Sequence, residues 1–145
     1  MDGSETSLEE ALRSLPHADP FRFLHRIHRL DDQGGLGTWE PTGKEAFFHG
    51  HFPGRPLVPG VLLVEAAAQL AGAAAHRTFG GDGGGMLVMH EARFKRPVEP
   101  PATIELEVVF DRSMGSIHRY DFTARVAGEV ASLGSVAVSI TGSES

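Results

Sequence analysis

Apolar residues surround the segment from Val61 to about His76 on every side instead of following one stripe. Alanine, leucine and valine dominate it, and no proline interrupts it. A helix that is apolar all round is a buried helix, and each buried Val or Leu side chain contributes roughly 1.5–3 kcal/mol. Pro59 and Gly60 suit the first turn, where a missing N–H costs no helical hydrogen bond. The pattern therefore predicts a helix that forms the core.

Apolar and polar residues alternate in residues 21–30 and 102–110, which predicts strands there. Residues 36–41, 86–94, 117–127 and 130–140 are further candidate strands. Residues 31–35 are expected to turn between the first two strands, and Gly128-Glu129 is expected to form a two-residue hairpin turn between the last two. One buried helix beside antiparallel strands indicates the α+β class, in a single domain that spans residues 1–145.

The two ends of the chain and one internal connector carry weaker signals. Ser7-Leu8-Glu9-Glu10 matches a capping box and predicts a short helix through about Ser14, so that residues 1–14 form an N-terminal helix or extension. The glycine-rich residues 80–85 lack the lysine and spacing of a phosphate-binding loop, which indicates a flexible linker. Residues 141–145 are expected to be a frayed tail.

Composition excludes several classes of protein. The chain has 145 residues, a net charge of −6 and no cysteine. Without a basic excess it is not expected to bind nucleic acid, and without thiols it has neither disulfides nor thiolate chemistry. No apolar run reaches the roughly 18 residues of a membrane span, and the acidic N-terminus lacks the apolar stretch of a secretion signal. A cytoplasmic protein without membrane insertion is predicted.

The candidate chemistry centres on Glu65, a carboxylate in the middle of the apolar helix. Such a group is either a structural glutamate bonded to its surroundings or a general acid. His51 enters the same stretch on a loop stiffened by prolines, and its imidazole suits proton transfer near neutral pH. Gln69 shares the helix face of Glu65 at i+4, where it either orients Glu65 or a substrate hydroxyl or makes an ordinary core hydrogen bond. His49 and His51 lack a third ligand, so no metal site is predicted.

Three stretches resemble a known family. H-F-P-G-R-P-L-V-P-G-V-L-L-V-E-A-A-A-Q (51–69) looks like the signature of the (3R)-hydroxyacyl-acyl-carrier-protein dehydratases of fatty acid synthesis, and L-P-H-A-D-P-F (15–21) and E-A-R-F-K-R-P-V (91–98) are further matches. The resemblance covers roughly residues 15–140. It implies a hotdog fold, a long helix wrapped by a curved antiparallel sheet, with His51 and Glu65 as the catalytic pair.

The resemblance also implies a reaction, in which a (3R)-hydroxyacyl thioester loses water and becomes a trans-2-enoyl thioester. His51 is then the general base, the Gly60 N–H stabilises the charge on the thioester oxygen, and Glu65 protonates or orients the departing hydroxyl. Further expected roles are substrate positioning by Phe52, Pro59 and Gln69, and an acyl tunnel lined by Leu62, Leu63, Leu87 and Met89. No cofactor is expected beyond the phosphopantetheine arm that carries the substrate.

The expected partners follow from the same resemblance. The basic residues Arg93, Lys95 and Arg96 are expected to dock an acidic acyl carrier protein. The family implies a homodimer, alone or assembled into a trimer of dimers, in which the histidine of one subunit faces the glutamate of the other. Two rival functions stay open, namely a hotdog thioesterase, in which a helix carboxylate activates water, and an acyl-thioester binder without catalysis.

The protein departs from the family pattern at three places, which bear on the length of the acyl group that it accepts and on the gating of the acyl tunnel. His25 and His90 stand where acidic residues are usual, and Met86-Leu87-Val88-Met89 lacks the tyrosine that often gates the tunnel.

Overall fold

The structure, a computed structural model, describes residues 3–13, 22–49, 56–81 and 85–140. Its elements are α1 (Gly3–Arg13), β1 (Arg26–Asp31), β2 (Gly34–Trp39), the short 3-10 helix η1 (Ala46–His49), α2 (Gly60–Phe79), β3 (Gly85–Phe94), β4 (Ile104–Met114), β5 (Ile117–Val126) and β6 (Glu129–Ile140). The strands form one antiparallel sheet in the order β1-β2-β4-β5-β6-β3. This confirms the predicted α+β architecture.

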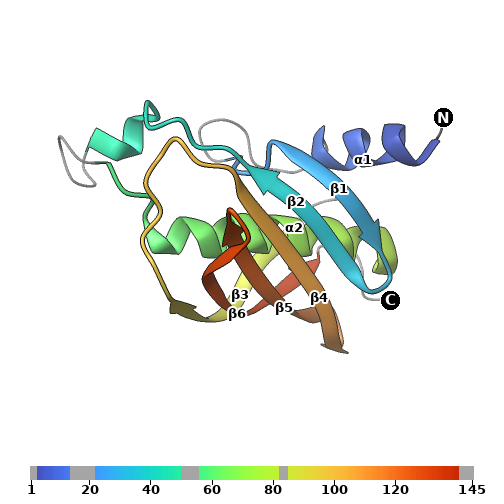
Figure 1. Cartoon of the computed structure of the whole chain (residues 1–145). Coiled ribbons are helices and arrows are strands. Elements are labelled where there is room, and N and C mark those ends of the chain that lie inside the picture. Colours follow the sequence, from blue (N-terminus) through green and yellow to red (C-terminus); the bar gives the residue numbers. More distant parts are fainter. Residues whose placement is uncertain (1–2, 14–21, 50–55, 82–84, 141–145) are drawn as a thin grey trace.

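Helix α2 lies across the inside of the curved sheet, while α1 packs beside β1 (Figure 1). Helix α2 begins at Gly60, directly after Pro59. It ends at Phe79, about one turn later than the pattern predicts, and the next residue, Gly80, has a φ of 89°, which glycine adopts without strain. None of the helices in the described part of the chain is long and apolar enough to span a membrane.

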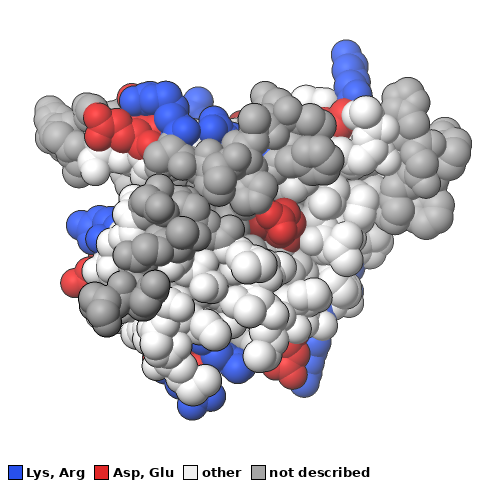
Figure 2. All heavy atoms as spheres, turned by 180° about the vertical axis from the view of Figure 1, so that it is seen from behind, with Lys and Arg blue, Asp and Glu red and all other residues white. Residues whose placement is uncertain are grey.

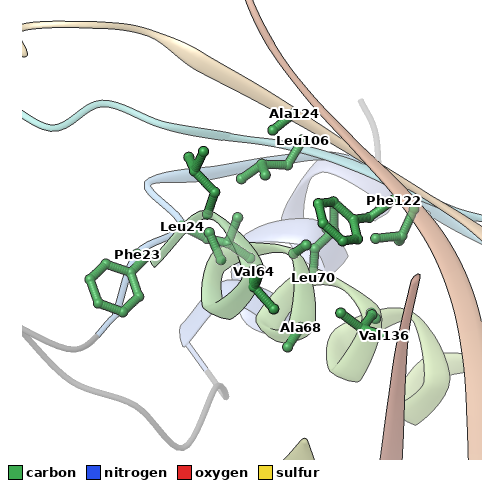
Figure 3. Close-up of a cluster of buried hydrophobic side chains, with 14 of the residues drawn as sticks. Phe23, Leu24, Val64, Ala68, Leu70, Leu106, Phe122, Ala124 and Val136 are labelled. Atoms are coloured by element: carbon green, nitrogen blue, oxygen red, sulfur yellow. The ribbon is translucent and has the colours of Figure 1, made fainter. Parts of the chain in front are cut away.

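The core lies between α2 and the inner face of the sheet, and Figure 3 shows part of it. Buried and less buried side chains alternate along much of β4 and β5, as expected for strands with one buried face, whereas β6 has consecutive buried residues. The buried side chains include Ile104, Leu106, Val108, Tyr120, Phe122, Ala124, Val136 and Val138. The expectation that α2 is buried on every side is wrong, because Val61 is 64% exposed and Glu65 and Gly72 are only half-buried.

Strand β1 is shorter than its alternating pattern suggests. Phe23 and Leu24 precede it and are buried in the core. The Phe23 N–H donates a hydrogen bond to the side chain of Gln69 on α2, 2.9 Å away, and not to a neighbouring strand. Packing on the helix therefore overrides the strand pattern at these positions.

The hairpin between β5 and β6 turns one residue earlier than predicted. Ala127 and Gly128 are its central residues, with φ values of 53° and 82°. Two positive φ values are typical of a type I′ turn, which matches the twist of the strands that it joins. Glu129 is the first residue of β6 and pairs with Val126.

The N-terminal helix also differs from its prediction. Because α1 begins at Gly3, Ser7 lies within the helix and does not open it. Residues 141–145, predicted to be a frayed tail, lie outside the described residues.

At the C-terminal end of α2, Phe79 stacks on His118 of β5, with ring centroids 4.0 Å apart. Nδ1 of this buried histidine lies 2.7 Å from the hydroxyl of Ser113. Burial lowers the pKa of His118, because the charged imidazolium is poorly solvated there.

Candidate active site

Glu65 lines a pocket of about 400 Å³ on the less buried side of α2. The other lining residues are Phe23, Val61, Leu62, Val64, Leu87 and His90. Figure 2 shows the molecule from behind, where one acidic side chain lies near the centre of the face beside a broad area of uncharged residues. A carboxyl group in a mostly apolar pocket is a candidate to act on a bound molecule, because pockets of this kind use a few placed polar groups to orient their ligands.

Gln69 holds Glu65 in place. Its side-chain Nε2 donates a hydrogen bond to Oε2 of Glu65, at 3.3 Å, and its Oε1 accepts the bond from the Phe23 N–H. Gln69 itself is only 3% exposed. Gln69 thus makes a core hydrogen bond and also contacts Glu65, and its role in orienting Glu65 or a substrate hydroxyl stays a prediction.

The start of α2 lies beside the pocket. The Pro59 carbonyl accepts the N–H of Leu62, at 2.9 Å, which closes the first turn. Gly60 is the first helical residue, so its N–H points out of the positive end of the helix. A Cβ at this position would lie 2.8 Å from the Phe94 ring, so glycine lets that ring cover the helix start.

A β-bulge in β3 decides which of its residues reach the pocket. Leu87 pairs with Val138 and Met89 pairs with Ala137, so Val88 is the extra residue. The bulge turns Leu87 and His90 to the same inner face, although they are three positions apart. Met89, expected in the acyl tunnel, instead lies on the outer face, 62% exposed and away from the pocket.

A second groove of about 470 Å³ runs along the other side of the helix start. Lys95 and Arg96 line it together with Gly60, Val61 and the buried Leu63. Arg96 also forms an ion pair with Glu129. The structure thus places Leu63 and two of the three basic residues at this groove, whereas Arg93 does not line it.

His51 and Phe52 lie outside the described residues, so the geometry of the proposed pair with Glu65 is not described. Within the described ranges, no three histidine, aspartate or glutamate side chains come together as ligands of a metal ion would.

Comparisons with known proteins identify the family. Residues 15–134 match the family model of the FabA-like domain. The chain is 41% identical over 123 residues to the 3-hydroxyacyl-acyl-carrier-protein dehydratase FabZ of Agrobacterium fabrum, a match that covers 82% of this chain and 79% of that protein. It is 40% identical over 137 residues to the same enzyme of Pectobacterium atrosepticum, covering 90% and 89%. The chain belongs to the FabA-like family.

Solved structures show the fold of this FabA-like protein. A chain of the dehydratase heterocomplex ApeI:P from Xenorhabdus doucetiae superposes with a TM-score of 0.76 at 15% identity, covering 91% of each chain. The virulence protein Cj0977 from Campylobacter jejuni superposes with a TM-score of 0.73 at 13% identity, covering 96% of this chain and 93% of that one. The fold is the hotdog fold, as predicted.

Sequence patterns alone miss four lining residues of the pocket in this FabA-like protein. They are Phe23, Val61, Val64 and His90. Phe23 lies outside any strand and is placed by its bond to Gln69, whereas His90 is placed by the bulge at Val88. Of the four, only His90 carried a signal in the sequence, because it stands where an acidic residue is usual.

Proposed function

We propose that this protein removes water from a (3R)-hydroxyacyl thioester carried on an acyl carrier protein and leaves a trans-2-enoyl thioester. It is a hydro-lyase of fatty acid or related lipid biosynthesis. The observation that carries the proposal is the half-buried Glu65, held by Gln69 in a pocket whose walls are mostly apolar. Similarity to FabZ dehydratases over most of the chain supports the same reaction.

The first half of the reaction removes a proton from the carbon next to the thioester carbonyl. We assign this step to the neutral imidazole of His51, on the basis of its place in the sequence motif. Negative charge then grows on the thioester oxygen. The Gly60 N–H, at the positive end of α2, is suited to receive that oxygen because it is fixed before the substrate arrives.

The second half breaks the bond between the third carbon and its hydroxyl oxygen. Glu65 donates a proton to this oxygen, so that water leaves, and the electron pair of the former C–H bond becomes the double bond. His51 then holds one proton and Glu65 lacks one, and exchange with solvent restores both. Proton transfer and charge stabilisation account for the whole reaction, so we propose no cofactor beyond the phosphopantetheine arm of the carrier.

The carrier is proposed to dock at the groove beside the helix start, where Lys95 and Arg96 lie next to Gly60. These side chains are exposed in a protein of net charge −6, so they form a local positive site for an acidic partner. A carrier bound there delivers its arm close to the end of α2 that we assign to the thioester. Arg93 belongs to the proposed docking surface only at its margin, because it does not line the groove.

We further propose a homodimer as the smallest active unit, with a trimer of dimers as a larger assembly. Strand β3 is an edge strand of ten residues with exposed Met86, Val88, Met89 and Phe94. A long apolar edge strand exposes unpaired backbone groups and favours pairing with another chain. Leu87 and His90 of this strand line the Glu65 pocket, which supports our proposal that the His51 of one copy completes the site of the other. The proposed location is the cytoplasm.

One assay separates this function from its rivals. (3R)-3-hydroxybutyryl thioester is incubated with the protein, and enoyl absorbance and free thiol are followed together. Dehydration raises the enoyl absorbance without releasing free thiol, and a thioesterase releases free thiol without raising that absorbance. A binding protein without catalysis changes neither. Glu65→Gln is expected to nearly abolish turnover with an unchanged melting temperature, whereas Glu40→Gln, an exposed glutamate outside the pocket, is expected to behave as wild type.

A further inference from the structure

Two polar side chains line the Glu65 pocket, and they differ in how they are held. Glu65 comes from α2 and is held by Gln69. His90 comes from β3, and no hydrogen bond or ion pair of its ring is found among the described residues. The remaining walls are the side chains of Phe23, Val61, Leu62, Val64 and Leu87. Apart from Glu65, the pocket thus holds one polar side chain, an imidazole with no partner among the residues that the structure describes.

The position of His90 in the sheet directs its ring to the pocket. His90 pairs with Val136 of β6, which is 1% exposed and belongs to the core between the sheet and α2. Residues directly opposite each other on neighbouring strands point to the same face, so His90 faces the helix side. The ring is exposed in the chain, so water satisfies its nitrogens when the pocket is empty.

We propose that His90 is a specificity-determining residue, which reduces the preference of the pocket for long apolar acyl groups over short ones. The proposal rests on the dehydratase function above, in which Glu65 acts on the 3-hydroxyl group. The part of the acyl chain beyond the third carbon then occupies the rest of the pocket. A 3-hydroxybutyryl group has one further methyl group and leaves the His90 ring in water.

A 3-hydroxydecanoyl group extends along the apolar walls and covers that ring. Its methylene groups gain by leaving water, but the imidazole loses its water without gaining a hydrogen bond, which is unfavourable. The net preference for a long chain is therefore smaller than the walls alone would provide. Replacing His90 by an apolar residue removes this penalty for the long chain.

The test compares (3R)-3-hydroxybutyryl and (3R)-3-hydroxydecanoyl thioesters on the same acyl carrier protein. The measured quantity is the ratio of kcat/KM for the long substrate to kcat/KM for the short one. His90→Leu is expected to raise this ratio about tenfold, because the long acyl chain then no longer covers a polar ring that has no hydrogen bond. His90→Val, which suits a strand, is a second apolar variant in case the leucine variant folds poorly. His90→Gln keeps hydrogen-bonding groups and is expected to stay near the wild-type ratio.

Met114→Leu is the control, because Met114 is an exposed methionine at the end of β4 and lines neither the pocket nor the groove. Its ratio is expected to equal that of wild type. An unchanged ratio in both apolar variants, or an equal rise in His90→Gln, would overturn the role of His90 while the dehydratase function stands. If wild type dehydrates neither substrate, the proposed function itself fails and the specificity role falls with it.

Discussion

The side-chain amide of Gln69 joins Glu65 to the backbone of Phe23, donating to Oε2 of Glu65 at 3.3 Å and accepting the Phe23 N–H at 2.9 Å. Gln69 is 3% exposed and is bonded to the backbone of Phe23, so it restricts the movement of the Glu65 side chain in the pocket. Catalytic groups depend on such support, since small misplacements of a reacting group lower rates strongly.

Gln69→Leu is expected to lower kcat at least tenfold with a smaller change in KM, because Glu65 loses the donor that orients it. The variant also leaves the buried Phe23 N–H without an acceptor, which is expected to cost about 1–3 kcal/mol of the free energy of unfolding. Steady-state kinetics and chemical denaturation measure the two effects. Gln69→Met, which has a similar size and no hydrogen bonds, should repeat both. Normal kcat per folded molecule in either variant would show that Gln69 supports only the fold.

The groove beside the start of α2 predicts that substrates bound to the acyl carrier protein are used better than coenzyme A thioesters. Reversing charge in Lys95→Glu and Arg96→Glu should raise KM several-fold for carrier-bound substrate and leave KM for the coenzyme A thioester nearly unchanged. Added salt should reduce the advantage of the carrier in wild type, because exposed charges are screened within roughly 8 Å at physiological salt. Arg112→Glu, an exposed arginine near the far end of β4, controls for net charge. Equal effects on both substrates would contradict docking at the groove.

A shared active site predicts complementation between two inactive variants. His51→Ala and Glu65→Gln are mixed under conditions that let subunits exchange. In a mixed dimer, one site lacks both groups and the other has an intact histidine and an intact glutamate. Random pairing makes half of the dimers mixed, so about a quarter of wild-type activity should return. If exchange is demonstrated and the activity stays at the level of the separate variants, His51 and Glu65 act within one chain.

The buried His118 predicts a pH dependence of stability. Its pKa in the folded protein is lowered by burial from the usual 6.5, so the unfolded chain binds the proton at a higher pH than the folded protein does. The stability that depends on neutral His118 is therefore complete above pH 6.5 and is lost as the pH falls below it. His118→Phe, which keeps an aromatic ring against Phe79, should lose less free energy of unfolding than wild type between about pH 7.5 and 5.5. Ser113→Ala keeps the titrating ring and should follow wild type. Parallel curves for wild type and His118→Phe would contradict the prediction.

Local physical chemistry in the sequence determined the main elements. The apolar run after Pro59 predicted a helix that is mostly buried, because exposing it would leave many Val, Leu and Ala side chains in water. Alternation then predicted the β4 strand, since an alternating pattern suits a sheet with one covered face. Glu65 stood out for a related reason: a carboxylate among apolar neighbours needs a partner or a function.

Tertiary structure alone decided which residues surround Glu65. A bulge at Val88 adds one residue to β3, so each later side chain of the strand points to the opposite face from the one that regular alternation would give. His90 therefore lines the pocket and Met89 does not. No local signal marks this, because the register of β3 is set by its pairing with β6. Phe23 likewise lies at the pocket because its N–H meets Gln69, a residue 46 positions away. Contacts between segments so far apart in the chain depend on how the helix packs on the sheet, which no short sequence pattern contains.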